Sequence, residues 1–262
     1  MKLGLEGRVA LVAASSRGLG RATAAELAAE GASVIMCARG ADALQKAAGE
    51  IEAASSARVL AIAGDLSEPD EVQRIVAEGT RALGPVDVLV TNTGGPPAGP
   101  FESHDREAWH AAVRQNLDSV VELTRAVLPG MKERGWGRII NVTSIAVKEP
   151  LDGLILSNSI RSAVTGFART LANEVAADGV TVNNVLPGYH RTRRVEQLAE
   201  RTAPAGGGPE DVMARWEREI PMGRLGDPRE FAAVVAFLAS ERASYVTGTS
   251  LQVDGGWVRG LL

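Results

Sequence analysis

The sequence predicts an α/β fold in which one parallel sheet is covered by helices on both faces. Short apolar segments that suit fully buried strands alternate with longer Ala-rich segments that suit helices along the 262 residues. Such alternation favours a right-handed, doubly wound sheet. With 45% hydrophobic residues and no break in composition, we expect one domain, residues 1–262.

Seven strands are expected, at 8–13, 33–38, 58–63, 86–90, 138–142, 180–185 and 250–253. The helices expected between them cover 21–30, 41–54, 68–82, 106–134, 160–176 and 227–240, the last with Asp227 as N-cap and Pro228 at its first position. Residues 189 to about 220 interrupt this order with an irregular Arg- and Gly-rich insertion that ends in a short helix containing Trp216. A long insertion beside strand ends predicts a lid over a substrate.

Composition excludes several classes of function. The 28 basic and 32 acidic residues give a net charge of −4, which provides no general attraction for nucleic acid. No apolar segment approaches the roughly 18 residues of a membrane span, so we expect a cytoplasmic protein. Cys37 is the single cysteine and is expected in the core, and the three histidines are too scattered to predict a metal site.

The first predicted strand leads into a turn of small residues that is typical of a phosphate site. Backbone N–H groups and a helix N-terminus can face a pyrophosphate where side chains are small. A plain tight turn between strand and helix is the alternative. The expected cofactor contacts here are Ser15, Ser16, Arg17, Gly18, Leu19 and Gly20.

Two arginines favour NADP(H) over NAD(H). Arg39 directly follows the second strand, where a carboxylate would bind a ribose 2′-hydroxyl and arginine accommodates a 2′-phosphate. Arg17, in the glycine turn, can supply a second guanidinium to the same phosphate. In the alternative interpretation both side chains are simply solvated.

Polar and small residues also follow other strands. Asp65 either contacts the ligand or caps the next helix, two alternatives that stay open. Asn116 lies mid-helix among apolar residues, where a buried amide needs a partner or a function. The further cofactor contacts expected at these strand ends are Asp65, Leu66, Asn92, Thr93, Gly94, Pro187, Gly188 and Thr192.

The stretch from Ser144 to Arg161 is the candidate catalytic segment. Ser144 follows the fifth strand at its carboxyl end, where ligands bind in open α/β sheets. Ser157 and Arg161 are four residues apart and share one face if a helix has begun there. A hydroxyl and a cation in this arrangement indicate an active-site pair.

The order and spacing of these motifs resemble the short-chain dehydrogenase/reductase family over essentially the whole chain, 3-oxoacyl-[acyl-carrier-protein] reductases in particular. The resemblance implies a single-domain Rossmann fold with a seven-stranded sheet, a carbonyl or alcohol substrate and a homotetramer. It implies that Asp65 and Asn92 line the adenine and ribose, and that Thr192 holds the nicotinamide carboxamide. It places Asn116 and Ser144 at motif positions of the family and implies that both are catalytic residues.

Two departures from the family pattern affect the expected chemistry. The glycine turn begins Ala13-Ala14 instead of Thr-Gly, which predicts retained cofactor binding with a modest change in the turn. The family's tyrosine and lysine positions hold Ser157 and Arg161. A tyrosine phenol, with a pKa near ~10, can be tuned to pass a proton, whereas serine is a shorter and much weaker acid and arginine stays protonated. The sequence therefore predicts an atypical active site.

Three functions remain open. The first is an NADP(H)-dependent oxidoreductase whose proton comes from Tyr189, from His190, or from Ser144 and Ser157 through water; Tyr189 as a packed residue of the lid hinge is the alternative. The second is a catalytically silent NADP(H)-binding sensor or partner protein. The third is a lyase, dehydratase or epimerase with His190 as its base.

The lid arginines bear on the substrate. Arg161 can join Arg191, Arg193 or Arg194 to bind an anionic small molecule. In the alternative, at least two of the lid arginines pair with Glu196 and Glu200 on a solvated helix face.

Overall fold

A computed structural model describes residues 2–203 and 207–261 and confirms the predicted sheet. All neighbouring strands pair in parallel, in the order β3-β2-β1-β4-β5-β6-β7. The strands are β1 Val9–Ala13, β2 Ser33–Ala38, β3 Val59–Ala63, β4 Val88–Thr91, β5 Gly137–Val142, β6 Val180–Pro187 and β7 Ser250–Val253. The order reverses between β1 and β4, which opens a crevice at the strands' carboxyl ends.

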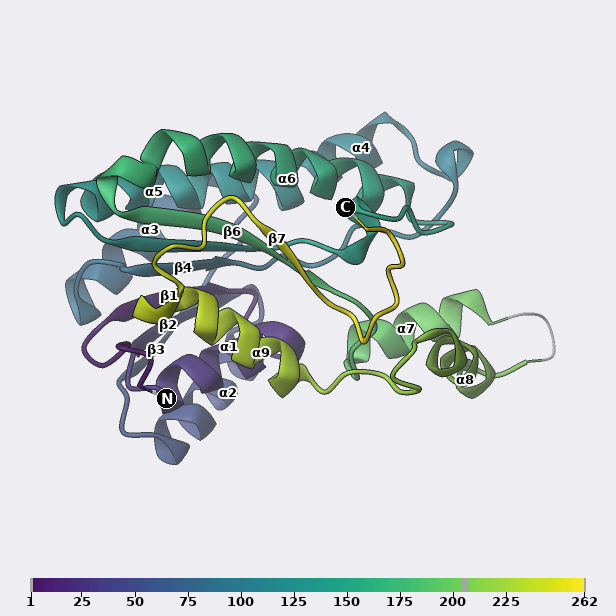
Figure 1. Cartoon of the computed structure of the whole chain (residues 1–262), viewed down its shortest axis with the longest axis horizontal. Helices are drawn as coiled ribbons and strands as arrows, with labels where there is room; N and C mark the ends of the chain where they lie inside the picture. Colours follow the sequence, from purple (N-terminus) through teal and green to yellow (C-terminus); the bar gives the residue numbers. More distant parts are fainter. Residues whose placement is uncertain (1, 204–206, 262) are drawn as a thin grey trace.

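Helices cover both faces of the sheet (Figure 1). On one face lie α1 Gly18–Ala29, α2 Ala41–Ala54 and α9 Pro228–Ala239; on the other lie α3 Pro69–Leu83, α5 Ser119–Glu133 and α6 Ile155–Val175. Alternate strand residues serve the two faces: Val12 packs with the first helix group and Leu11 with the second. Asp227 caps α9 as predicted, and its carboxylate accepts a hydrogen bond from the backbone N–H of Arg229. No helix of the described residues is both long and apolar enough to span a bilayer.

The helix expected over residues 106–134 is interrupted. It divides into α4 Arg106–Val113, a π-helical turn Arg114–Asp118, and α5. The turn contains Asn116, whose Nδ2 donates to the Ala112 carbonyl at 3.2 Å while its Oδ1 accepts from the Thr93 hydroxyl at 2.9 Å. This buried amide therefore has its partners, and it ties the turn to the loop after β4.

The lid is more regular than the sequence suggests. The expected irregular start is a helix, α7 Arg193–Thr202, and a second helix, α8 Pro209–Glu219, contains Trp216; residues 204–206 of the predicted lid lie outside the described residues. Ala199, Val212 and Trp216 form a small core between these helices, separate from the two cores of the sheet. Figure 1 shows α7 and α8 projecting beyond the sheet where β6 ends.

Helix α6 begins at Ile155, five residues earlier than expected, so Ser157 lies in its first turn. The 3-10 turns are Phe101–Ser103, Ile145–Val147, Ala176–Asp178 and Glu241–Ala243.

Replacing Ala14 by glycine is expected to stabilise the protein. Ala14 has a φ of 48°, a left-handed conformation that costs an L-residue about 1 kcal/mol or more. Glycine removes this cost, but it also increases the conformational entropy of the unfolded chain. We therefore expect the free energy of unfolding to rise by less than about 1 kcal/mol, which raises Tm by a few degrees. Thermal denaturation measures the shift. The control Ala13→Gly, in buried strand β1, should lower Tm; a lowered Tm for Ala14→Gly would contradict the prediction.

Candidate functional site

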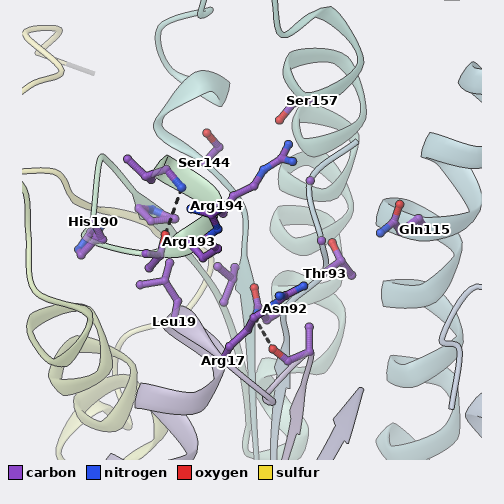
Figure 2. A pocket seen from close by; sticks show the side chains of 18 of the residues that line it. Arg17, Leu19, Asn92, Thr93, Gln115, Ser144, Ser157, His190, Arg193 and Arg194 are labelled. Carbon is purple, nitrogen blue, oxygen red and sulfur yellow. Dashed lines mark hydrogen bonds between the residues drawn. The ribbon is translucent and has the colours of Figure 1, made fainter. Parts of the chain in front are cut away.

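A cavity of about 520 Å³ lies at the carboxyl ends of the strands (Figure 2). Loops from six strands and the lid contribute to its wall, as the doubly wound topology requires of a site at the switch point. Most of the residues singled out from the sequence lie in this wall: Ser16, Arg17, Gly18, Leu19, Arg39, Asp65, Leu66, Asn92, Thr93, Gly94, Ser144, Ser157, Arg161, Pro187, Gly188, Tyr189 and Thr192.

Three of the predicted residues do not line the cavity. The Ser15 hydroxyl is buried and donates to the Cys37 carbonyl at 3.4 Å. Asn116 is directed at Thr93, behind the wall. At Gly20 a Cβ would lie 2.5 Å from the Ala14 carbonyl oxygen, so this glycine allows α1 to pack closely on the turn. All three residues contribute to the packing and hydrogen bonding behind the cavity wall.

The glycine turn presents a helix N-terminus to the cavity. Helix α1 begins at Gly18, which has a φ of 57°, and its first turn carries no acidic residue. A Cβ at Gly18 would lie 3.5 Å from the Thr192 methyl group, so the turn and the start of the lid face each other across a narrow groove. Small residues, exposed N–H groups and the helix dipole fit the diphosphate of a dinucleotide.

Arg39 and Asp65 form the far end of the cavity. The Arg39 guanidinium is mostly exposed and lies 4.0 Å from the Asp65 carboxylate, which also accepts hydrogen bonds from the Ser67 N–H at 3.0 Å and hydroxyl at 2.8 Å. Burial alone would raise the pKa of Asp65, but the Ser67 hydrogen bonds and the Arg39 charge outweigh it and lower the pKa. Helix α3 has Glu68 as its N-cap, so the capping role considered for Asp65 is wrong.

Ser144, Ser157 and Arg161 also line the cavity. The Ser144 oxygen accepts from the Ala146 N–H at 3.1 Å, which leaves its own proton free to donate. Ser157 is half-buried on the first turn of α6 (Figure 2). Arg161, one turn further on, is 8% exposed.

Backbone carbonyls hold the Arg161 side chain. Its Nη1 donates to the Val142 carbonyl at 2.8 Å and its Nη2 to the Thr93 carbonyl at 3.4 Å. Burial, and secondarily the charge of Arg194, lowers the pKa of Arg161 to about 10, so it remains a cation at neutral pH.

Tyr189 packs against the lid. Its ring stacks on Trp216 with centroids 4.4 Å apart and meets the edge of Trp257 at 6.2 Å. Burial, with a contribution from Glu219, raises the pKa of Tyr189 to about 12. These features favour the interpretation of Tyr189 as a packed residue of the lid hinge.

His190 is almost completely buried. Its Nδ1 lies 3.2 Å from the Gly188 carbonyl and its ring meets Phe231 edge-on, and burial lowers its pKa. His190 also lines the cavity, and the contact of Nδ1 with a carbonyl leaves Nε2 as the acceptor, so His190 stays a candidate base for the lyase alternative.

The lid arginines have different partners. Arg191 pairs with Glu217 at 2.7 Å, and Arg193 pairs with Glu196 and Glu200 at 3.4 and 3.0 Å. Arg194 instead donates from Nη2 to the Pro96 carbonyl at 2.9 Å and lines the cavity. Thus Arg193 is paired as the solvated-face alternative describes, and Arg194 is directed toward the site.

Sequence reasoning missed part of the wall. Gln115 enters from the π-helical turn and approaches Gly94, where a Cβ would lie 3.0 Å from its Nε2. Leu151 and Leu154 supply apolar surface beside Ser157. The polar pair Gln115-Asn116 in an otherwise regular helical pattern was the available signal for the first of these. Within the described ranges no group of His, Cys, Asp or Glu could hold a metal ion.

Known proteins resemble this chain over nearly its full length. A family model described as Enoyl-(Acyl carrier protein) reductase matches residues 13–258. A 3-oxoacyl-[acyl-carrier-protein] reductase of Vibrio cholerae is 38% identical, covering 97% of this chain and 98% of the relative. An acetoacetyl-CoA reductase of Allochromatium vinosum is 34% identical, covering 95% and 98%. The crystal structure of L-sorbose reductase from Gluconobacter frateurii, complexed with NADPH and L-sorbose, superposes with a TM-score of 0.94 at 34% identity, covering 100% of both chains.

Proposed function

The chain belongs to the short-chain dehydrogenase/reductase family of oxidoreductases, and from this premise we propose that it reduces the carbonyl group of a small molecule with NADPH. One observation carries the proposal: a single cavity joins the phosphate-binding features at Arg17 and Arg39 to the hydroxyls of Ser144 and Ser157. When bound, NADPH supplies the hydride. The NADPH complexes of similar solved structures support this choice of cofactor.

Arg161 would stabilise the charge that develops on the carbonyl oxygen. Its guanidinium is fixed on the Val142 and Thr93 carbonyls, so it needs no reorganisation when the charge appears. Because Arg161 stays protonated, it acts as an electrostatic group and not as the proton donor.

The proton would arrive through water held by Ser144 and Ser157. Both hydroxyls line the cavity, and neither is acidic enough to supply the proton itself. This route fits an oxidoreductase with an atypical active site. Ser157 and Arg161 in the family's tyrosine and lysine positions equally motivate the alternative, a catalytically silent NADP(H)-binding sensor or partner protein.

Assembly and location follow from the resemblance and stay predictions. We expect a homotetramer and a cytoplasmic protein. Phe237 on α9 and Leu251 on edge strand β7 are both partly exposed, which leaves apolar surface for contact with another copy. Light scattering in solution measures the assembly.

The function is tested by binding and turnover in parallel. NADPH binding is followed by its fluorescence, and NADPH oxidation is followed with ketones, ketoses, quinones and 3-oxoacyl thioesters. We expect binding and oxidation with at least one carbonyl class. Binding without oxidation across the panel would favour the sensor, and absence of binding would refute both functions.

Replacing Tyr189 by phenylalanine is expected to leave kcat within about twofold of the unchanged protein. The phenol is not a proton donor in this proposal, and its raised pKa, about 12, makes it a weaker acid than an ordinary tyrosine. Steady-state NADPH oxidation measures kcat. A loss of about 100-fold, the scale of a missing general acid, would identify Tyr189 as the donor instead.

A further inference from the structure

Two arginines from distant parts of the chain donate to one loop of the cavity wall. The loop follows β4 and covers Thr93 to Pro96. Arg161 of α6 donates to its first carbonyl, Thr93, at 3.4 Å, and Arg194 of α7 donates to its last, Pro96, at 2.9 Å. The loop therefore brings the two guanidinium groups to one part of the cavity wall, to which Ser157 also contributes.

The loop is shaped to admit Arg194. A Cβ at Gly95 would lie 2.8 Å from its Nη2 and 3.3 Å from its Cζ. Gly95 has no left-handed φ that would itself require glycine, so the missing side chain serves the close approach of the guanidinium.

In the part of the chain that the structure describes, no carboxylate pairs with these two charges. Within the described ranges neither Arg161 nor Arg194 forms an ion pair, although most other lid arginines do. Among the described residues, the acidic one in the cavity wall is Asp65, which lies beside Arg39 at the other end. Burial, and then the charge of Arg194, lowers the pKa of Arg161, as expected for a cation without a counter-ion.

The two groups retain unused donors. A guanidinium has five N–H groups, and Arg161 and Arg194 commit only some of them to backbone carbonyls. Both residues line the cavity, so the remaining donors are available to a ligand. Guanidinium groups match carboxylates with two parallel hydrogen bonds each.

We propose that Arg194 binds a carboxylate of the substrate, which is then an oxo acid, and that the charge of Arg161 adds to the attraction while its guanidinium serves the carbonyl oxygen. The oxo group of this ligand rests on the proposed reductase function; the carboxylate site rests only on the two arginines. Ser144 and Ser157 line the same cavity as the two arginines, whereas Arg17, Arg39 and the N-terminus of α1 provide for the cofactor's phosphates.

Calorimetry with acetoacetate and its uncharged methyl ester tests the site, with and without NADP⁺. We expect the acid to bind at least about tenfold more tightly than the ester. Arg194→Met should remove most of this difference by weakening acid binding alone. Arg193→Met is the matched control. Arg193 is adjacent to Arg194 and also borders the cavity, but it pairs with Glu196 and Glu200, so this variant should still bind the acid more tightly than the ester.

A gentler variant avoids loss of the charge. Gly95→Ala displaces the Arg194 guanidinium while both arginines remain, and it should also weaken acid binding more than ester binding. Equal binding of acid and ester, or an unchanged preference in Arg194→Met, would overturn the site while the reduction of neutral carbonyls stands. An Arg194→Met variant that loses NADP⁺ affinity but keeps acid binding would also overturn it, because Arg194 would then serve the cofactor's diphosphate. Preferential acid binding without NADPH oxidation would uphold the site and count against the reductase.

Discussion

The double variant Ser157→Tyr with Arg161→Lys is expected to reduce a neutral ketone at least about 100-fold faster than the unchanged protein. A positioned general acid contributes about 10² to 10⁴ in rate, and neither Ser157 nor Arg161 provides one. A tyrosine phenol beside a lysine ammonium provides the missing group, because the ammonium lowers the pKa of the phenol toward neutrality. Steady-state kcat with NADPH measures the gain.

The position of Ser157 allows this exchange. Its side chain faces the cavity from the first turn of α6, so a longer side chain extends into the space of about 520 Å³. The residue four positions later, Arg161, lies on the same face of the helix, so a lysine there follows the tyrosine closely.

Two controls separate the phenol from other effects. Ser157→Phe with Arg161→Lys fills the same space without an ionisable group and should show no gain. In the tyrosine variant the phenol must be protonated to donate, so kcat for reduction should fall as pH rises through the pKa of the phenol. An unchanged kcat would contradict the prediction and indicate that the proposed water route is already efficient.

The sheet and the nucleotide end of the cavity were predictable because local sequence determines them. Strands β1, β2 and β4 are short, largely apolar segments buried on both faces, and the glycine turn that follows β1 leads into a helix by its own composition. The observed strands agree with the predicted ones to within about two residues. The agreement of Asp227 and Pro228 with the start of α9 has the same local cause.

Long-range contacts explain most of what the sequence did not reveal. The π-helical turn at Asn116 is tied to Thr93, which lies 23 residues earlier, and helical periodicity contains no sign of that contact. Helix α7 is rich in arginine and glutamate, and its apolar side is recognisable only once α8 packs on it.

The buried polar residues of the strands show the same limit. The Thr91 hydroxyl donates to Asn141 at 2.7 Å, Asn141 donates to Asn184 at 3.3 Å, and Asn184 donates to the Ser250 hydroxyl at 3.1 Å. The strand register brings these four residues into one row across β4, β5, β6 and β7. The row satisfies amides that would otherwise be costly to bury, and it stiffens the sheet next to Ser144.

The lid arginines could not be told apart by sequence. Arg191 finds Glu217 at a separation of 26 residues, whereas Arg194 finds the Pro96 carbonyl at a separation of 98. Only the three-dimensional arrangement distinguishes an arginine paired on the surface from one directed into the cavity.

Replacing Arg39 by alanine is expected to weaken NADPH binding about 10- to 100-fold and to leave NADH binding within about twofold. The Arg39 side chain is mostly exposed, and its distance to Asp65, 4.0 Å, indicates a loose pair that a phosphate can displace. A charge-assisted bond from arginine to phosphate contributes about 1.5–3 kcal/mol, and NADH has no phosphate at that ribose position. Fluorescence titration with both cofactors measures the two affinities.

A nearby arginine outside the cavity is the control. Arg21 lies on α1 and pairs with Glu50 at 2.6 Å, so Arg21→Ala removes the same charge from the same region without altering the cavity wall. It should change NADPH affinity by less than about threefold, because an exposed charge at that distance is screened. If Arg39→Ala and Arg21→Ala weaken NADPH equally, the general charge of this region and not a phosphate contact sets the preference. Tighter binding of NADH than NADPH by the unchanged protein would refute the roles of Arg17 and Arg39 together, since both depend on the 2′-phosphate.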